Sequence, residues 1–489
     1  MSFPPSSKDP RAQVPVWAQA LPLSVVQSML FLSAWDPALQ HSDDVRVLSL
    51  LGSTPAELTT LCEAGQAAGA LRYERRRWRS RGESGQSIQW TDAKATWRQL
   101  AWTLDDAACE RFAAACRVAY AGECSMTLRR GMALSLALLG NSDGRIAVLP
   151  QPSQRAAAII ERILPASLPA WGKLGDLLPL FAEAAPESFL TCAEHAVSQA
   201  ANPPGNAQTE ATQEIQSAAE AIARVLALLA LDVLLLPRVT RLLGRLAALC
   251  PPPRPNVHTG HPLQVLAAIF RPNWPMTNAG IEERFAALEA LRQDSPATAW
   301  DLILQLLSAG RAIFLQPPRP VVLQISIPSR THGVSAAALY GQQQTLLGWA
   351  IELAGNDGRR WAALLPLEAH LFADLFIGLL RHLQTIQPAG LSHRTTLWAA
   401  LRASLDRFRP EPEASAGESA SQAASDRKVH QQQSEALTRA LYDALTPTDF
   451  VAAHAWLAQL ELQPRKRAEQ LAGIGLRLGC FGSRALLCR

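Results

Sequence analysis

The sequence has no apolar run long enough to cross a bilayer. The longest, Val225 to Leu236, is about 12 residues and contains Asp232, whereas a membrane-spanning helix needs roughly 20. The first residues include Lys8, Asp9 and Arg11 but no apolar core of the kind that a secretory signal needs. We therefore expect a cytoplasmic protein with no membrane partner.

Cysteine is infrequent, and the patterns of metal sites are missing. None of the eight cysteines forms a C-x-x-C pair, which indicates buried thiols in a reducing compartment. Cys250, His258 and His261 share a proline-rich segment, but that segment offers no fourth ligand and no zinc-like spacing. We predict no metal site.

The motifs of nucleotide-binding and catalytic sites are missing as well. The single Gly-Lys pair, Gly172-Lys173, lacks the earlier glycine of a P-loop. Gly140 to Gly144 matches G-x-S-x-G, but a helical run precedes it where a nucleophile elbow needs a strand. We predict no catalytic residue and no cofactor, so the chain is expected not to be an enzyme. An enzyme with an unfamiliar site is the remaining alternative.

The chain is rich in short apolar segments. Its 489 residues are 48% hydrophobic and 18% charged. This length exceeds the usual single core of about 250 to 300 residues, which predicts several domains or a repeat array. The 34 prolines and 28 glycines lie between apolar runs, as many short helices require. The net charge of +4 is too small to indicate general binding of polyanions.

Residues 21–91 predict a small N-terminal unit, after an unstructured lead over residues 1–20. Apolar residues recur at helical spacing from Leu23 onward. Asp43 or Asp44 can cap a second helix, because aspartate accepts hydrogen bonds from the first free N–H groups of a helix.

The third helix has the clearest start. Thr54 and Glu57 form a capping box with Pro55 at the first helical position, and Gly69 is placed to end the helix. Residues 71–90 then have strand character around a polar turn. Three helices followed by a hairpin are typical of a winged helix, so we predict a winged-helix-like N-terminal unit.

Beyond the hairpin, apolar helical segments alternate with turns rich in Pro, Gly, Asn and Asp. Such segments must stack on their neighbours to bury their apolar faces. The fold class predicted is mainly α, with an irregular HEAT/TPR-like α-solenoid after the winged-helix-like unit. Val321 to Ile327 alternates and predicts a strand. The expected divisions are 92–250 and 251–409 for the two halves of the array, 410–427 for a disordered linker, 428–465 for C-terminal helices and 466–489 for an atypical tail.

An arginine-rich run, interleaved with aromatic residues, occupies the predicted hairpin. Basic side chains there can bind phosphates of nucleic acid or contact a partner protein. The helix that would enter a DNA groove has Glu57 and Glu63 and no basic residue, which favours a solvated wing or a contact with another protein over DNA binding. The candidate residues are Arg72, Arg75, Arg76, Arg77, Trp78, Arg79 and Arg81.

Three stretches are distinctive: Trp171 to Glu187 (WGKLGDLLPLFAEAAPE), Ile269 to Asn278 (IFRPNWPMTN) and Leu441 to Pro447 (LYDALTP), followed by His454 to Leu457 (HAWL). In order and spacing they resemble large bacterial STAND-type (NACHT-like) signalling ATPases linked to antiphage defence. The resemblance covers most of residues 21–460. It implies that ATPase and effector modules precede the winged helix, whereas only residues 1–20 precede it in this sequence. We therefore expect a split, truncated or frame-disrupted gene.

The function expected from the sequence is a non-catalytic helical sensor or interaction module. It would bind a protein ligand and relay that event to a partner ATPase in a defence or signalling system. The alternative is a winged-helix DNA-binding transcriptional regulator with a helical sensing domain.

Overall fold

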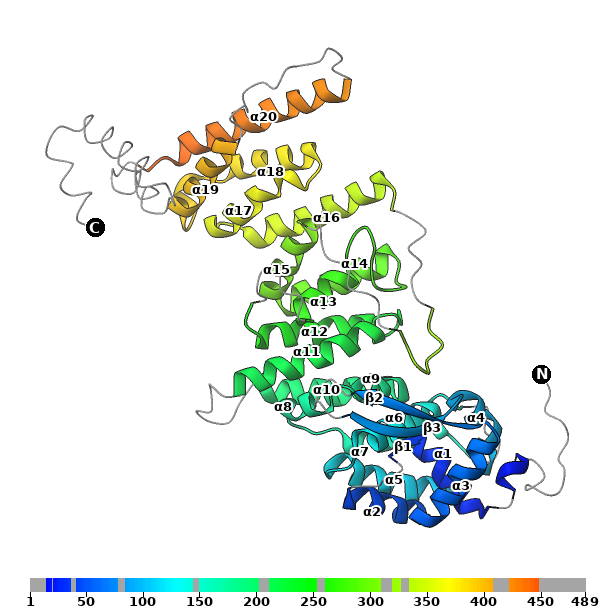
Figure 1. Ribbon diagram of the computed structural model, residues 1–489. Coiled ribbons are helices and arrows are strands. Elements are labelled where there is room, and N and C mark those ends of the chain that lie inside the picture. The colour runs from blue at the N-terminus through cyan, green and yellow to red at the C-terminus, as the bar shows by residue number, and fades with distance from the viewer. Residues whose placement is uncertain are drawn as a thin grey trace. The chain divides into compact units, whose positions relative to one another are not determined.

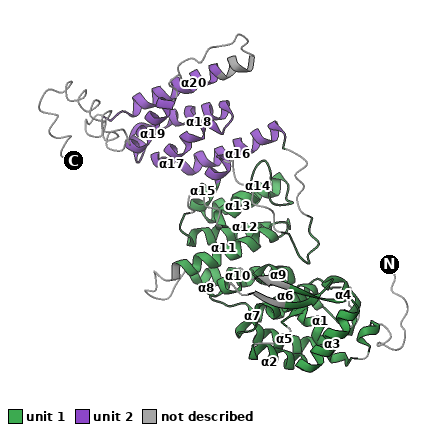
Figure 2. Cartoon of the chain, viewed as in Figure 1, with its two compact units in different colours: residues 1–302, 313–334 green, residues 303–312, 335–489 purple. Residues whose placement is uncertain are grey.

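The computed structural model of the chain is mainly α-helical (Figure 1). Two compact units make up the chain, residues 1–302 with 313–334 and residues 303–312 with 335–489 (Figure 2). The structure describes residues 15–19, 21–36, 41–77, 84–143, 149–201, 211–252, 260–308, 319–326, 334–407 and 422–447.

Unit 1 begins with three helices and a three-stranded antiparallel sheet, whose strand order is β1–β3–β2. The register places Leu71 opposite Trp90 and Ala34 opposite Gln89. The elements are η2 (Val16–Ala18), α1 (Leu23–Leu32), β1 (Ala34–Trp35), α2 (Ser42–Leu51), α3 (Pro55–Ala67), β2 (Leu71–Arg77), β3 (Ser84–Trp90) and α4 (Ala93–Leu100).

The predicted boundaries of α3 are confirmed. The Glu57 carboxylate accepts a hydrogen bond from the Thr54 backbone N–H at 2.8 Å, and the Glu57 backbone N–H donates to the Thr54 hydroxyl at 3.3 Å. The capping box therefore satisfies two N–H groups that the helix itself leaves free. Gly69 follows the helix at φ +69°, in the left-handed region that glycine tolerates.

The predicted caps of α2 are wrong. His41 occupies the capping position, and Asp43 and Asp44 lie in the first turn. Their carboxylates accept hydrogen bonds from the backbone N–H groups of Glu123 and Ser125, both at 2.9 Å. The two carboxylates therefore accept hydrogen bonds from a distant loop and not from the first N–H groups of α2, as the sequence pattern predicts.

Two glycines allow α6 (Met126–Gly140) to pack directly on backbone. A Cβ at Gly131 would lie 2.0 Å from the Leu32 carbonyl oxygen, next to β1. A Cβ at Gly140 would lie 1.8 Å from the Ala184 carbonyl oxygen of α9. Any larger residue would separate α6 from both neighbours.

The rest of unit 1 is a succession of helices that pack on helices close to them in the chain. Helix α12, for example, contacts α10, α11, α13 and α14. The elements are η3 (Ala101–Thr103), α5 (Asp106–Ala121), α6, α7 (Pro152–Ile163), α8 (Leu168–Trp171), η4 (Gly172–Leu174), α9 (Leu178–Ala184), α10 (Pro186–Ala201), α11 (Ala211–Leu229), α12 (Leu236–Leu249), α13 (Pro262–Ile269) and α14 (Ile281–Asp294).

Unit 2 is also helical. The Arg394 guanidinium, at the start of α19, donates to the carbonyl oxygens of Ala444, Leu445 and Thr446 at 3.2 to 3.4 Å, which satisfies the last turn of α20. The elements that lie wholly in unit 2 are α16 (Ala336–Ala354), α17 (Gly358–Leu364), η6 (Leu365–Ala369), α18 (Ala373–Thr385), η7 (Pro388–Gly390), α19 (Arg394–Arg407) and α20 (Gln422–Leu445).

The two units separate at Leu302, within α15 (Pro296–Leu307). Helix α20 begins at Gln422, inside the segment predicted as a disordered linker.

Two further local predictions differ from the structure. Val16–Ala18 forms a 3₁₀ turn within the predicted unstructured lead, and the Trp17 ring lies 6.0 Å from the Trp90 ring. Residues 321–326 form no strand, although the sequence predicts one from Val321 to Ile327.

No helix among the described residues is long and apolar enough to cross a membrane.

Candidate functional site

The arginine-rich candidates begin on strand β2, which lies at the edge of the sheet. Arg72 is exposed and sits opposite Gln89. The backbones of Arg75, Arg76 and Arg77 continue the pairing with β3. The other candidates, Trp78, Arg79 and Arg81, lie outside the described residues.

Helix α3 presents an uncharged and acidic surface. Its exposed side chains include Ala56, Thr59, Thr60 and Glu63, and the helix contains no Lys or Arg. A helix that enters the major groove of DNA is flanked by phosphates, which favour basic side chains. The surface of α3 offers such phosphates no neutralising charge.

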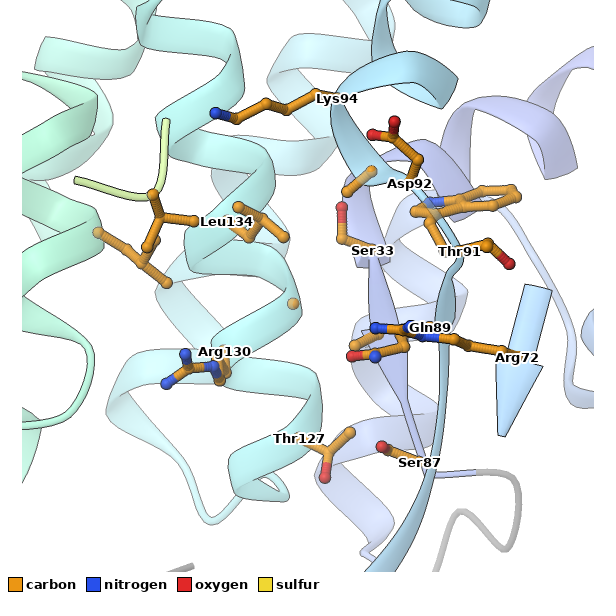
Figure 3. A pocket seen from close by; sticks show the side chains of 16 residues that line it. Ser33, Arg72, Ser87, Gln89, Thr91, Asp92, Lys94, Thr127, Arg130 and Leu134 are labelled. Carbon is orange, nitrogen blue, oxygen red and sulfur yellow. The ribbon is translucent and has the colours of Figure 1, made fainter. Parts of the chain in front are cut away.

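A groove of about 390 Å³ lies between the sheet and helix α6 (Figure 3). Thr127, Arg130 and Leu134 line it from α6, and the side chains of β3 and its neighbours face them from the sheet. Leu180 of α9 and Val321 complete the lining. The groove therefore joins segments that are far apart in the sequence.

The groove is lined by three basic side chains, Arg72, Lys94 and Arg130, and by one carboxylate, Asp92. Among the described residues, neither the Arg72 guanidinium nor the Lys94 ammonium has a hydrogen-bond or ion-pair partner. Asp92 caps α4, because its carboxylate accepts from the Ala95 backbone N–H at 2.9 Å. The groove thus carries a positive balance of charge, with two cations that no side chain in the described part of the chain neutralises.

Residues 319–326, which we call the strap, are held beside the groove by a buried carboxylate. Glu183 is 1% exposed. It accepts backbone hydrogen bonds from Val321 at 2.8 Å, from Leu323 at 2.9 Å and from Val322. These three donors balance a buried charge that would otherwise be costly. The same bonds place the Val321 side chain in the groove lining.

Ser142 of the G-x-S-x-G match is buried and has only structural contacts. Its hydroxyl accepts from the Trp97 indole N–H at 2.9 Å and donates to the Leu138 carbonyl oxygen at 2.6 Å. No histidine base contacts it among the described residues. The Gly172-Lys173 pair lies in the short 3₁₀ helix η4.

His261 has a structural role as the cap of α13. Its Nδ1 accepts from the Leu263 backbone N–H at 3.1 Å, and its Nε2 lies 3.0 Å from the Pro251 carbonyl oxygen. Burial lowers the pKa of the imidazole below its ordinary value of 6.5, although the Pro251 contact opposes that shift. His258, which shares the proline-rich segment with Cys250 and His261, lies outside the described residues.

The described cysteines are poor nucleophiles. Burial raises the pKa of Cys62, Cys109 and Cys250 to about 11 and that of Cys124 to about 12. The thiolate, which is the reactive form, is therefore scarce at neutral pH. Among the described residues, no cluster of three or more His, Cys, Asp and Glu side chains could hold a metal ion.

In comparisons with known proteins, no family model, no curated protein and no solved structure matches the chain.

Sequence reasoning found Arg72 but missed the groove and the strap. The signal for Arg130 was present, because Arg129 and Arg130 are consecutive basic residues in the otherwise apolar run of α6. Lys94 and Glu183 gave no such signal, since each lies in an ordinary helical pattern. Their significance depends on contacts between distant segments.

Proposed function

We propose that the chain is a helical interaction module that binds a protein ligand and relays that event to a nucleotide-binding partner. The observation that carries the proposal is the order of elements in unit 1. The order α1–β1–α2–α3–β2–β3, with the sheet order β1–β3–β2, leads directly into a long succession of helices. This order supports a winged-helix-like unit followed by an irregular HEAT/TPR-like array.

The neighbour-to-neighbour packing of the helices supports the second half of the proposal. Each helix from α10 to α14 contacts helices near it in the chain. Stacked helix pairs of this kind present extended surfaces, which suit large protein ligands better than small substrates. The proposed setting, bacterial defence, rests on the resemblance of the three distinctive stretches to STAND-type ATPases.

The relay is tested by affinity capture with the full chain from bacterial lysates prepared with and without phage infection. We expect a nucleotide-binding ATPase to co-purify with the chain, and nucleotide hydrolysis by that complex to change on infection. A chain that remains alone in both lysates would contradict the proposal. A matched capture with a chain denatured and immobilised in the same way controls for nonspecific adsorption.

The alternative function is a winged-helix transcriptional regulator. Strand β2 favours it, because four of its seven residues are arginine, at positions 72, 75, 76 and 77. The exposed surface of α3 opposes it, because that surface lacks the basic residues that phosphate contacts require.

Fluorescence anisotropy with duplex DNA at low salt tests the alternative. A regulator would bind with an affinity that falls steeply with salt, and simultaneous replacement of Arg75, Arg76 and Arg77 by glutamine would weaken that binding. An absence of binding at low salt would refute the regulator hypothesis and would not affect the interaction-module proposal.

A further inference from the structure

The outer edge of strand β2 carries backbone groups that no described residue bonds. The Thr91 backbone N–H donates to the Ala70 carbonyl oxygen at 2.9 Å, just before the strand begins. Hydrogen-bonded and non-hydrogen-bonded pairs alternate along antiparallel strands, so Leu71 and Tyr73 form pairs of the second kind with β3. Their N–H and C=O groups therefore point to the open edge of the sheet, and in the described part of the chain none of these groups has a partner.

The hydrogen bond made by Trp90 supports this alternation. Its backbone N–H donates to the Ser33 carbonyl oxygen at 3.3 Å, on the β1 side of β3, and so points away from Leu71, which lies opposite Trp90. The same alternation turns the backbone groups of Arg75 and Arg77 to the open edge. Strand β2 thus offers one side of a ladder to which a further strand can be added.

Tyr73 shows that the sheet surface beside this edge is open as well. Its partner in the register, Ile88, is 1% exposed, whereas Tyr73 is 58% exposed. The same face of the sheet is therefore covered at β3 and uncovered at β2. Because aromatic and β-branched side chains stabilise a strand pair when they lie opposite each other, the edge favours an added strand with an apolar residue opposite Tyr73.

The charge of β2 selects an acidic strand. Four of its seven residues are arginine and one is glutamate, and the Glu74 carboxylate accepts a hydrogen bond from the Gln89 side chain. Opposite charges across a strand pair stabilise it, and like charges destabilise it. A second copy of β2, paired antiparallel over its full length, would put Arg72 opposite Arg76 and Glu74 opposite its own copy. The strand therefore disfavours pairing with itself.

We propose that the edge of β2 binds an extended acidic segment of a partner protein, which joins the sheet as a fourth strand. The backbone of this segment pairs with the outward groups of β2, an apolar residue lies opposite Tyr73, and acidic residues lie opposite the arginines. The segment runs antiparallel to β2, the more common direction in sheets. This inference rests on the proposed function, since it names the chemistry of the protein ligand and the surface that binds it.

Fluorescence anisotropy with the full chain and the fluorescein-labelled peptide EEETVEV, at low salt, tests the proposal. In the antiparallel register this peptide places valine opposite Tyr73, threonine opposite Glu74 and glutamate opposite each arginine. We expect saturable binding. Replacement of every glutamate in the peptide by glutamine should weaken that binding at least about tenfold, because all the opposite-charge pairs are lost.

N-methylation of the peptide tests the backbone pairing, because it removes an N–H group and leaves the charge unchanged. Methylation of the residues opposite Tyr73 and Arg75 should weaken binding at least about tenfold, since their N–H groups face β2. Methylation of the residues opposite Arg72 and Glu74 is the matched control. Their N–H groups face away from β2, so binding should be nearly unchanged.

Variants of the chain test the same edge. Arg75→Gln should weaken peptide binding severalfold, and Tyr73→Pro should abolish it, because proline removes an N–H group from the open edge and spares the bonds to β3. Arg46→Gln is the matched control, since Arg46 is an exposed residue of α2 and its loss should leave binding unchanged. The methylated peptides need no change in the chain, so the test does not depend on the folding of Tyr73→Pro.

Four outcomes would overturn the proposal. The parent chain binds duplex DNA but not the peptide, or binds neither; the two methylation patterns weaken binding equally; Arg46→Gln weakens it as much as Arg75→Gln does; or sedimentation shows a dimer that Tyr73→Pro dissociates, in which case a second copy occupies the edge. Capture of an ATPase by a chain that does not bind the peptide would refute this inference alone. Peptide binding by a chain that captures no partner would instead contradict the proposed relay.

Discussion

The buried Glu183 offers a direct test of how the strap is held. Its carboxylate is 1% exposed and accepts three backbone N–H groups, those of Val321, Val322 and Leu323. Glu183→Gln preserves the shape of the side chain but removes its charge and one of its two acceptor oxygens. We expect the strap to detach more readily in this variant, while the helices of unit 1 stay folded.

The size of the effect follows from the three hydrogen bonds. If the amide oxygen takes the position that accepts from Val322 and Leu323, the bond to Val321 is lost, at a cost of about 1.5 to 3 kcal/mol. The two remaining bonds become neutral, which costs about 1 kcal/mol each. The total is roughly 3 to 5 kcal/mol, and it applies to local opening of the strap.

Hydrogen exchange, followed by mass spectrometry, measures this local opening of the strap. A change of about 3 to 5 kcal/mol corresponds to amide exchange that is faster by roughly a hundredfold to several thousandfold in peptides covering residues 319–326. Glu187→Gln is the matched control, because Glu187 lies nearby in the chain but its side chain is 70% exposed and pairs with the half-buried Arg238. Its effect should stay below about 1 kcal/mol.

Unchanged exchange of the Val321 to Leu323 amides in Glu183→Gln would refute this reasoning. Equal acceleration in the Glu187→Gln control would refute it too, because the effect would then come from net charge and not from the buried acceptor.

Three further changes test other parts of the fold. Burial lowers the pKa of His261 below 6.5. As the pH falls, the imidazole therefore binds its proton at a higher pH in the unfolded chain than in the folded chain. The unfolding free energy, measured with urea, should therefore decrease as the pH falls below 6.5, and less steeply in His261→Asn. Gly131→Ala should lower the unfolding free energy by about 3 kcal/mol or more, because its Cβ would meet backbone atoms at 2.0 Å; a variant with the parental melting temperature would contradict the close packing of α6. Thr54→Ala should cost about 1 kcal/mol through loss of the cap, whereas Thr59→Ala, on the exposed surface of the same helix, should change stability by less than about 0.5 kcal/mol; equal effects in a urea titration would argue against the capping box.

Local sequence rules located the elements that depend on neighbouring residues. Thr54, Pro55, Glu57 and Gly69 specify where α3 begins and ends, because a capping box and a left-handed glycine act within a few residues. The same rules failed for Asp43 and Asp44, since a loop 80 residues away supplies their hydrogen-bond donors.

The strap shows why tertiary context changed a second prediction. The alternation from Val321 onward is a strand pattern, but no neighbouring strand pairs with the described residues 321–326. The N–H groups of Val321, Val322 and Leu323 bond to Glu183 instead, some 138 to 140 residues away. A strand needs a ladder of partners, and here a single buried carboxylate satisfies the donors.

The sequence by itself determined the helical character of this protein, the capped start of α3 and the hairpin over residues 71–90, because apolar periodicity, caps and turns act over short distances. Only the tertiary structure decided that Arg72, Lys94 and Arg130 line one groove and that Glu183 holds the strap beside it. The groove depends on the packing of α6 against the sheet through Gly131, and the strap on contacts across some 138 to 140 residues. Contacts between distant segments carry no periodic signal along the chain, so a site formed by them appears only when the chain has folded.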